Sequence, residues 1–238
     1  MTPRARGLLG GFRLAMLAFA AVCPVLAPLA QGTVSGQITL AEPKTAAKHD
    51  VANAVIFLEP ADRPSRYGRA TGELSSMSVA MRDREFIPHI QLVRAGGSVD
   101  FPNLDSFSHN VFSNSSLGAF DLGLYRRGTS RVASFPRVGV YAIYCNIHAS
   151  MVSFVVAVAN SMFARAGPDG RFSMPDVPAG SYILHVWHER TPEVVEPLEV
   201  TAAGIRTLSV SLDTRGTPAT AHLNKFGQPY AVYRADRY

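Results

Sequence analysis

The chain has 238 residues, enough for one or two domains, and a formal net charge of +5 at pH 7. Residues 1–32 carry three of the basic residues and none of the acidic ones, so a protein without them has a net charge of +2. The remaining positive charges are scattered and interleaved with acids, which argues against nucleic acid as a partner.

The first 32 residues have the pattern of a secretory signal peptide. Three arginines precede an apolar run over residues 14–29, and small residues follow at Ala30 and Gly32. The run is shorter than the ~20 residues that a membrane span needs, and two prolines interrupt it. We expect cleavage near Gly32, export to the periplasm and no membrane span in the mature protein. An uncleaved anchor is the alternative.

Cleavage would leave Cys145 as the only cysteine, since Cys23 lies within the signal. A lipoprotein attached at Cys23 is a second alternative, but Val22 is a poor fit to the small residue that such sites require. An exported chain with one cysteine has no internal disulfide. A lone exposed thiol is a hazard in an oxidising compartment, whereas a metal-bound thiolate is not. The competing interpretation of Cys145 is a buried structural cysteine.

Two strands are predicted in the segment after the signal. Residues 34–40 alternate apolar and polar side chains. Residues 51–58 form the second predicted strand, with one face made of Ala52, Ala54, Ile56 and Leu58. Residues 60–76 are rich in Pro, Arg, Gly and Ser and are expected to form a linker or a long surface loop. Residues 33–74 either add strands to the domain that follows or form the first part of a discontinuous domain.

The middle of the chain is predicted to be an antiparallel β-sandwich, because no segment has a convincing period of 3.6 residues. Alternation along residues 138–145 places Tyr141 and Ile143 on the same side as Cys145, towards the core. Residues 114–123 are expected to form a flexible loop. The strand-like segments are residues 77–81, 86–93, 98–101, 109–112, 130–135, 138–145 and 153–158.

Cys145, His148 and Met151 place a thiolate, an imidazole and a thioether within seven residues. With His109 they complete the set that a blue-copper site needs: two His and one Cys in a plane, with a weak axial Met. His89 is the next candidate for the first histidine ligand.

The pattern His109-Asn110 followed by Cys145-x2-His148-x2-Met151 resembles the copper site of the cupredoxins, with the loop spacing of amicyanin rather than plastocyanin. The resemblance covers residues 77–159 and implies a cupredoxin domain over residues 75–160. It implies a Greek-key β-sandwich that holds one type 1 copper ion through His109, Cys145 and His148, with Met151 weakly axial. It also implies that Asn110 ties the two ligand loops together. Ala149 stands where the family often has Pro, which leaves loop rigidity and redox potential open.

A different module is predicted beyond residue 160. Strands alternate with an Asp169-Gly170 turn and a Pro178-Ala179-Gly180 turn, and two more strands follow at residues 195–200 and 207–212. This pattern resembles a carboxypeptidase regulatory-like, transthyretin-type β-sandwich over residues 161–213. The Gly36-Gln37-Ile38 and Ala54-Val55-Ile56 stretches fit the opening strands of such a module. In one arrangement, residues 33–74 and 161–213 therefore form one discontinuous sandwich, and the simpler alternative keeps residues 33–74 as extra strands on the copper domain.

His185 and His188 lie on opposite faces of a predicted strand, so we expect a packed Trp187 with surface histidines rather than a second metal site. Residues 214–238 are predicted to be a C-terminal tail, draped over the domain through Phe226, Tyr230 and Tyr233.

The copper-site resemblance implies an exported one-electron carrier that cycles between Cu(II) and Cu(I), with electrons passing through His148. Its partner would be a transient redox protein such as a c-type cytochrome or a periplasmic dehydrogenase, docking on a small apolar patch of Ile147, Ala149 and Met151. An enzyme is not expected, because the His-x-His pairs of multicopper oxidases are missing. The main alternative is a periplasmic copper-binding or delivery protein without an electron-transfer role. In a third interpretation the transthyretin-like module is an adhesion or assembly unit.

Overall fold

A computed structural model of the chain describes residues 31–41, 50–62, 77–201, 205–215 and 222–230. This part is all-β, as predicted, with one three-residue 3-10 helix, η1 (Val51–Asn53). The signal peptide prediction falls almost entirely on residues 1–30, and most of the predicted linker falls on residues 63–76, so both lie outside the described residues. No helix of the described part is long and apolar enough to cross a membrane.

The middle of the chain forms a β-sandwich, called here the metal-site sandwich. One sheet has five strands in the order β6-β12-β11-β8-β9, and the other has three in the order β10-β7-β3. A short β4-β5 pair lies beside them. The strands are β3 (Met77–Ser78), β4 (Ala80–Arg82), β5 (Glu85–Ile87), β6 (Ile90–Arg94), β7 (Gly97–Pro102), β8 (His109–Ser113), β9 (Phe120–Tyr125), β10 (Ser130–Phe135), β11 (Gly139–Tyr144) and β12 (Val152–Val158).

Side chains from both sheets meet in one hydrophobic core. The alternation along β11 points Tyr141 and Ile143 inward, and both are fully buried with Cys145 just beyond the strand end. Phe101 of β7 and Phe135 of β10 close the core from the opposite sheet. The Cys145 side chain therefore points into the core at the end of β11, as the period-two pattern predicted.

Several details of the predicted strands are wrong. The predicted strand over residues 77–81 is divided into β3 and β4, which belong to different sheets, and the first three residues of the predicted strand over residues 51–58 form η1. The sandwich was predicted to be antiparallel, but the pairs β6–β12 and β3–β7 are parallel.

Residues 114–123 were expected to be a loop, but β9 begins at Phe120 and pairs with β8. Phe120 and Leu122 pack against the core, which outweighs the turn-forming residues nearby. The predicted strand over residues 86–93 is divided into β5 and β6 around Pro88, which has no N–H to donate to a ladder.

The segments on either side of the metal-site sandwich share a second sandwich, called here the flanking sandwich. β1 lies between β14 and β17, and β2 lies between β13 and β15, whose other neighbour is β16. A separate core fills the space between these two sheets. Its likeness to transthyretin-type modules stays a prediction. The strands are β1 (Gln31–Ala41), β2 (Val55–Pro60), β13 (Phe163–Arg165), β14 (Arg171–Pro178), β15 (Gly180–Trp187), β16 (Val194–Val200) and β17 (Ile205–Asp213).

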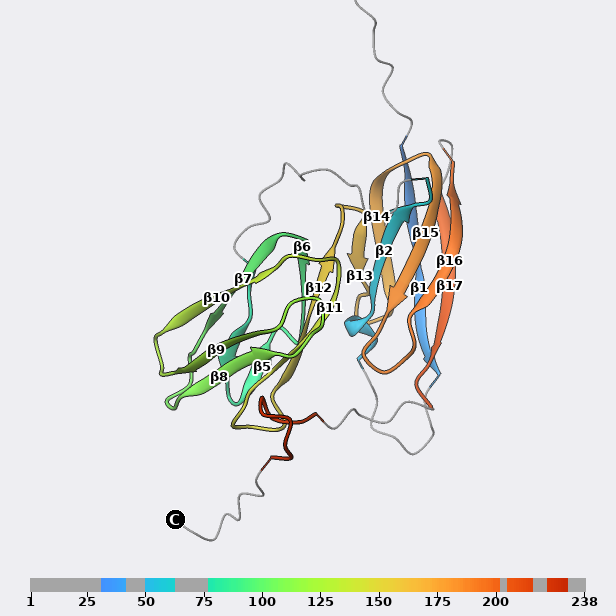
Figure 1. The fold of residues 1–238 in the computed structure, drawn as a ribbon. Coiled ribbons are helices and arrows are strands. Elements are labelled where there is room, and N and C mark those ends of the chain that lie inside the picture. Colours follow the sequence, from blue (N-terminus) through green and yellow to red (C-terminus); the bar gives the residue numbers. More distant parts are fainter. Residues whose placement is uncertain (1–30, 42–49, 63–76, 202–204, 216–221, 231–238) are drawn as a thin grey trace, which may run out of the picture.

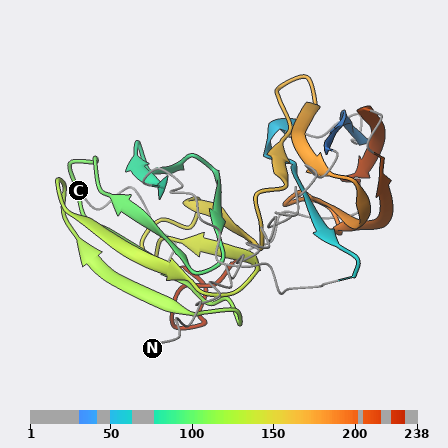
Figure 2. The same ribbon diagram turned by 90° about the horizontal axis from the view of Figure 1, so that it is seen from above.

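The two sandwiches lie side by side, with β2 and β13 of one next to β6 and β12 of the other (Figure 1; Figure 2). A third apolar cluster joins them, formed by Val55 and Phe57 of β2 with Ile90 and Val156 and their neighbours. Both faces of β2 and β12 are therefore buried, which explains their nearly continuous apolar sequences. Trp187 packs against this cluster, as expected for a packed tryptophan.

His89 makes a polar link across the same boundary. Its Nε2 lies 2.8 Å from Glu189 Oε2, and its Nδ1 lies 3.1 Å from the carbonyl oxygen of Val152. Both partners only accept hydrogen bonds, so both ring nitrogens must donate and the imidazole must be protonated. The hydrogen bond to Glu189 raises the pKa of His89 despite its burial, in agreement with this geometry.

His188 departs from the prediction that it is a surface residue. Its side chain is fully buried, with Nε2 3.3 Å from the carbonyl oxygen of Asp50 and Nδ1 accepting from the backbone N–H of Arg190. The ring satisfies two backbone groups at a loop junction, which the strand pattern of residues 185–188 could not indicate. His185 lies on the other side, stacked on Phe57 at 4.6 Å, so the two imidazoles diverge as predicted.

The His89–Glu189 pair predicts a pH-dependent contribution to stability. The raised pKa of His89 means that the contribution is present below the ordinary pKa of 6.5 and is lost as the pH rises through the folded-state value. The pKa of Glu189 is lowered by the same bond, so its share is present above 4.5 and is lost in acid. For this partly exposed pair we expect roughly 0.5–1 kcal/mol after allowance for solvent screening.

Urea unfolding of the metal-free protein at pH 5.5 and pH 8.5 measures this contribution, with Glu189→Gln as the comparison. We expect the unfolding free energy of the wild type to exceed that of Glu189→Gln by a larger margin at pH 5.5 than at pH 8.5. Glu193→Gln provides a matched control, since it removes an acid that bonds to His185 within the flanking sandwich and not across the boundary. A difference between wild type and Glu189→Gln that is the same at both pH values would contradict the protonated link.

Candidate metal centre

The three donors predicted from the sequence come from the start of β8 and from the loop between β11 and β12. Tyr144 of β11 pairs with Phe112 of β8 in antiparallel register. Continuing that register brings His109, the first residue of β8, level with the loop that follows Cys145. His148 lies in this loop, and Met151 ends it immediately before β12.

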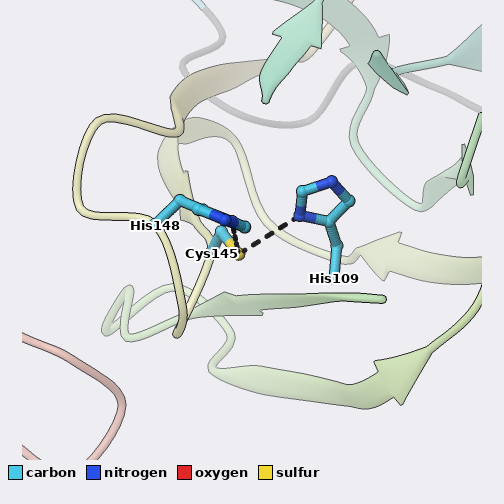
Figure 3. A group of neighbouring side chains, drawn as sticks. All are labelled: His109, Cys145 and His148. Carbon is cyan, nitrogen blue, oxygen red and sulfur yellow. Dashed lines mark hydrogen bonds between the residues drawn. The ribbon is translucent and has the colours of Figure 1, made fainter. Parts of the chain in front are cut away.

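His109, Cys145 and His148 converge on one point (Figure 3). The Cys145 Sγ lies 3.7 Å from His109 Nδ1 and 3.8 Å from His148 Nδ1. One ligand atom from each residue lies within 4.8 Å of the others. Two imidazole nitrogens and one thiolate at this spacing form the donor set that suits copper, with soft sulfur favouring Cu(I).

Asp105 fixes the orientation of the His109 ring. Its Oδ2 accepts a hydrogen bond from His109 Nε2 at 2.7 Å, and both side chains are buried. Because the Nε2–H group donates to the carboxylate, the Nδ1 atom is the ring nitrogen that can bind a metal. The Asp105 carboxylate is itself held by the backbone N–H groups of Asp83 and Arg84, at 2.6 and 3.0 Å.

Hydrogen bonds favour the ionised form of Cys145. Burial raises the pKa of the thiol, but the His109 imidazole and backbone N–H groups, including that of Ile147 at 3.5 Å, together lower it below the ordinary value. Burial also opposes protonation of His109, while Cys145 and Asp105 raise the pKa of His109 overall. Both shifts favour the ionised pair of thiolate and imidazolium over the neutral pair, and a metal ion that binds these atoms competes with the protons.

His148 differs from His109 in exposure and in protonation. It is only half-buried, whereas His109 is fully buried. Burial together with the positive charges of His109 and Arg84 lowers the pKa of His148, so its ring is neutral near pH 7. A neutral imidazole binds metal without first losing a proton.

The loop of residues 145–151 is closed by its own backbone. The N–H of Cys145 donates to the carbonyl of Met151 at 3.3 Å, and the N–H of Met151 donates to the carbonyl of His148 at 3.0 Å. The Met151 side chain is fully buried in the same core cluster as Cys145. The thioether therefore lies on the inner side of the loop.

Two expectations about this site change, and the fallback ligand His89 lies elsewhere. The Asn110 side chain donates to Asp121 on β9 at 2.6 Å, and it is its backbone N–H that hydrogen-bonds to Cys145. Met151 is not part of the exposed apolar patch, because it fills the core. His89 is bound to Glu189 and Val152 and lies outside the His–Cys–His group.

Asp105 and Phe107 were missed by the sequence interpretation. The Phe107 ring lies 5.0 Å from the His109 ring and 5.7 Å from the His148 ring, and the side chain is partly exposed beside them. A carboxylate four residues before a ligand histidine was the available signal for Asp105. No comparable spacing rule indicated Phe107, since only the fold brings it over both imidazoles.

Comparison with known proteins gives structural likeness only. A scan of protein-family models found no match, and neither did a search of curated proteins. An amicyanin from Paracoccus versutus (Thiobacillus versutus) is 20% identical over 37% of this chain and 87% of its own, with a TM-score of 0.34. A purple cupredoxin from Nitrosopumilus maritimus is 21% identical over 35% of this chain and 100% of its own, with a TM-score of 0.32.

We predict that Asp105→Asn weakens copper binding about 10- to 100-fold, because the amide no longer fixes the His109 tautomer with a charged acceptor. Competition with a Cu(I) chelator measures the affinity. Asp83→Asn is the matched control: Asp83 is exposed at φ 55°, a conformation that Asn also adopts readily, and it contributes only its backbone N–H. Equal affinities for wild type and Asp105→Asn would show that Asp105 does not orient the ligand.

Proposed function

We propose that this protein is an exported one-electron carrier with one type 1 copper ion held by His109, Cys145 and His148, and Met151 as a weak axial ligand. The observation that supports this proposal best is the convergence of both Nδ1 atoms on the Cys145 Sγ at 3.7 and 3.8 Å. The bound copper would accept and give up one electron by alternating between Cu(II) and Cu(I). The other contacts of the site hold the donor side chains in place.

A carrier needs donors that keep their positions when the charge at the centre changes. His109 is held by Asp105, and the Cys145 sulfur accepts from backbone N–H groups on two segments. These groups are ordered by strand β8 and by the closed loop, so the geometry does not depend on long flexible side chains. A preorganised site of this kind requires little rearrangement for electron exchange.

The half-buried His148 is the proposed point of electron entry and exit. Ile147 and Phe107 are each 37% exposed beside it, so they offer a small apolar surface for brief contact with another redox protein. A c-type cytochrome or a periplasmic dehydrogenase is the kind of partner we propose. No catalytic reaction is proposed for this centre.

A copper delivery protein is the competing candidate, since a carrier and a delivery protein can share Cys, His and Met donors. Copper titration followed by absorption and reversible reduction separates them. We expect one copper per chain, an intense thiolate-to-copper band and full recovery of the band after a cycle of reduction and oxidation. A colourless protein that holds only Cu(I) would support delivery and contradict the carrier.

Loss of a donor should remove the site selectively. We predict that Cys145→Ser abolishes the charge-transfer band and that His109→Ala removes stable copper binding, while the sandwich core stays folded in both. His89→Ala is the matched control, because His89 lies outside the donor group. If His89→Ala abolished the band while His109→Ala retained it, the ligand assignment would be wrong.

Replacement of Met151 should alter the electronics without loss of copper. Met151→Gln offers an oxygen donor that favours Cu(II), so the reduction potential should fall by about 100 mV, which corresponds to less than a hundredfold shift in equilibrium. Met151→Leu keeps a similar volume without any donor, so its potential should rise. Voltammetry of the three proteins measures both shifts; unshifted potentials in both variants would mean that Met151 is only a core residue.

A further inference from the structure

Residues 222–230, called here the strap, lie against the end of the metal-site sandwich where β11 and β12 are joined (Figure 1). The Tyr230 hydroxyl donates to the carbonyl oxygen of Cys145 at 2.7 Å. The His222 Nε2 donates to the carbonyl oxygen of Ala149, also at 2.7 Å. The strap thus contacts the backbone on both sides of His148.

Ring contacts add to these two hydrogen bonds. The His222 ring stacks on Tyr144 with centroids 4.1 Å apart and an interplanar angle of 19°. The Tyr230 ring lies edge-on to the His222 ring, with centroids 5.1 Å apart. His222 is therefore enclosed between an aromatic residue that precedes Cys145 and one that bonds to it, which limits the freedom of the strap at this point.

Lys225 joins the ligand loop to β9, the strand next to the one that carries His109. Its backbone N–H donates to Asn146 Oδ1 at 2.9 Å, and its Nζ donates to Asp121 Oδ2 at 2.7 Å. The other oxygen of Asp121 accepts from Asn110, the neighbour of His109. No described residue hydrogen-bonds the buried Oδ1 of Asn110, so the Asp121 contact is what holds that side chain.

The strap also has an internal turn that sets its shape. Asn224 Oδ1 accepts from the backbone N–H groups of Phe226 and Gln228, and the Asn224 N–H donates to the carbonyl of Gln228. Gly227 takes φ 73°, which a glycine adopts without strain. Phe226 is 70% exposed, so it adds little to the contact with the sandwich.

We propose that the strap is a positioning element of the metal centre, with His222, Lys225 and Tyr230 as its positioning residues. It holds the ligand loop from outside, at Cys145, Asn146 and Ala149, and ties it to β8 through Asp121 and Asn110. The donors of the loop and of β8 thereby keep their mutual spacing. The link to metal rests on the proposed copper function, whereas the contacts themselves are made by this chain's own residues.

The experiment therefore begins without metal. Hydrogen exchange of the backbone amides of residues 145–151 is compared in the metal-free wild type, Tyr230→Phe, His222→Ala and Phe226→Ala. We expect about fivefold faster exchange for Tyr230→Phe, as for loss of one hydrogen bond, and a larger increase for His222→Ala. Phe226→Ala, a change of an exposed aromatic residue within the same strap, should match the wild type.

The second part uses copper-loaded protein. Transfer of Cu(I) to a chelator should be about fivefold faster for Tyr230→Phe, and the thiolate-to-copper absorption of the oxidised protein should shift in position or intensity. Lys225→Met should show the same behaviour, and Lys225→Arg, which can still pair with Asp121, should restore the wild-type values. If the strap had a purely structural role, the Tyr230→Phe and Lys225→Met variants would have the wild-type spectrum, and Lys225→Arg would have nothing to restore.

The outcomes separate the two proposals. Unchanged exchange at residues 145–151 in both Tyr230→Phe and His222→Ala would overturn the strap, whether or not the protein binds copper. Faster exchange in these variants of a protein whose wild type binds no copper would support the strap contacts and overturn the copper function. Faster exchange with unaltered copper transfer and spectrum would overturn the positioning role. Thermal unfolding checks that each variant keeps its folded core.

Discussion

The structure depends on keeping one sulfur atom between two imidazole nitrogens inside a protein core. A fully buried cysteine is ordinarily a small hydrophobic side chain. Here the Cys145 sulfur instead accepts backbone hydrogen bonds and lies beside His109, a fully buried histidine. Burial of these polar groups is unfavourable unless each has a partner. The chain supplies those partners from several elements, and the requirement explains why so many polar contacts gather at one end of an otherwise apolar sandwich.

The contacts around the centre form successive layers. Cys145, His109 and His148 make up the inner group, and Asp105 accepts a hydrogen bond from the Nε2 atom of His109. Outside them, the strap contacts the loop and, through Lys225 and Asp121, the strand β8. The layers are uneven: His109 is anchored on a buried strand, whereas His148 is half-buried on a loop. This asymmetry suits the proposed electron carrier, which needs rigidly held donors and one histidine near the surface.

The flanking sandwich stabilises the same region from the opposite side. β12 begins immediately after Met151, and its outward face packs on the flanking sandwich through Val156 and Val158. His89 donates to Val152, the first residue of β12, and to Glu189. The strand that ends the ligand loop is thus fixed by both sandwiches, although the centre itself belongs to one.

The sequence predicted the local parts of this arrangement well. Period-two alternation placed Cys145 inward, and the spacing of Cys145 and His148 pointed to the loop whose donor atoms meet His109 in the structure. Contacts between distant segments could not be predicted in the same way. The pairing of Asp105 with His109 needs a particular turn geometry, and the contact of His222 with Ala149 joins residues 73 apart. The strand β9 was missed because Gly123 and nearby polar residues suggested a loop, while the burial that decides the matter appears only in the folded sandwich.

The tail was predicted to lie over the domain through Phe226, Tyr230 and Tyr233, and the outcome shows why aromatic content alone is a weak guide. Tyr230 makes the contact, Phe226 is largely exposed, and Tyr233 lies outside the described residues. The residues that hold the strap also include His222 and Lys225, whose partners are backbone carbonyls and an acid on another strand. Hydrogen-bond complementarity of this kind has no signature in sequence periodicity.

X-ray absorption spectroscopy at the copper edge tests the central assignment most directly, because it reports the ligand atoms themselves. The copper-loaded wild type should show a first shell of one sulfur and two nitrogens, as the group of Cys145, His109 and His148 requires. The sulfur contribution should disappear in Cys145→Ser. A first shell of nitrogen and oxygen alone in the wild type, or a spectrum that Cys145→Ser leaves unchanged, would contradict the account.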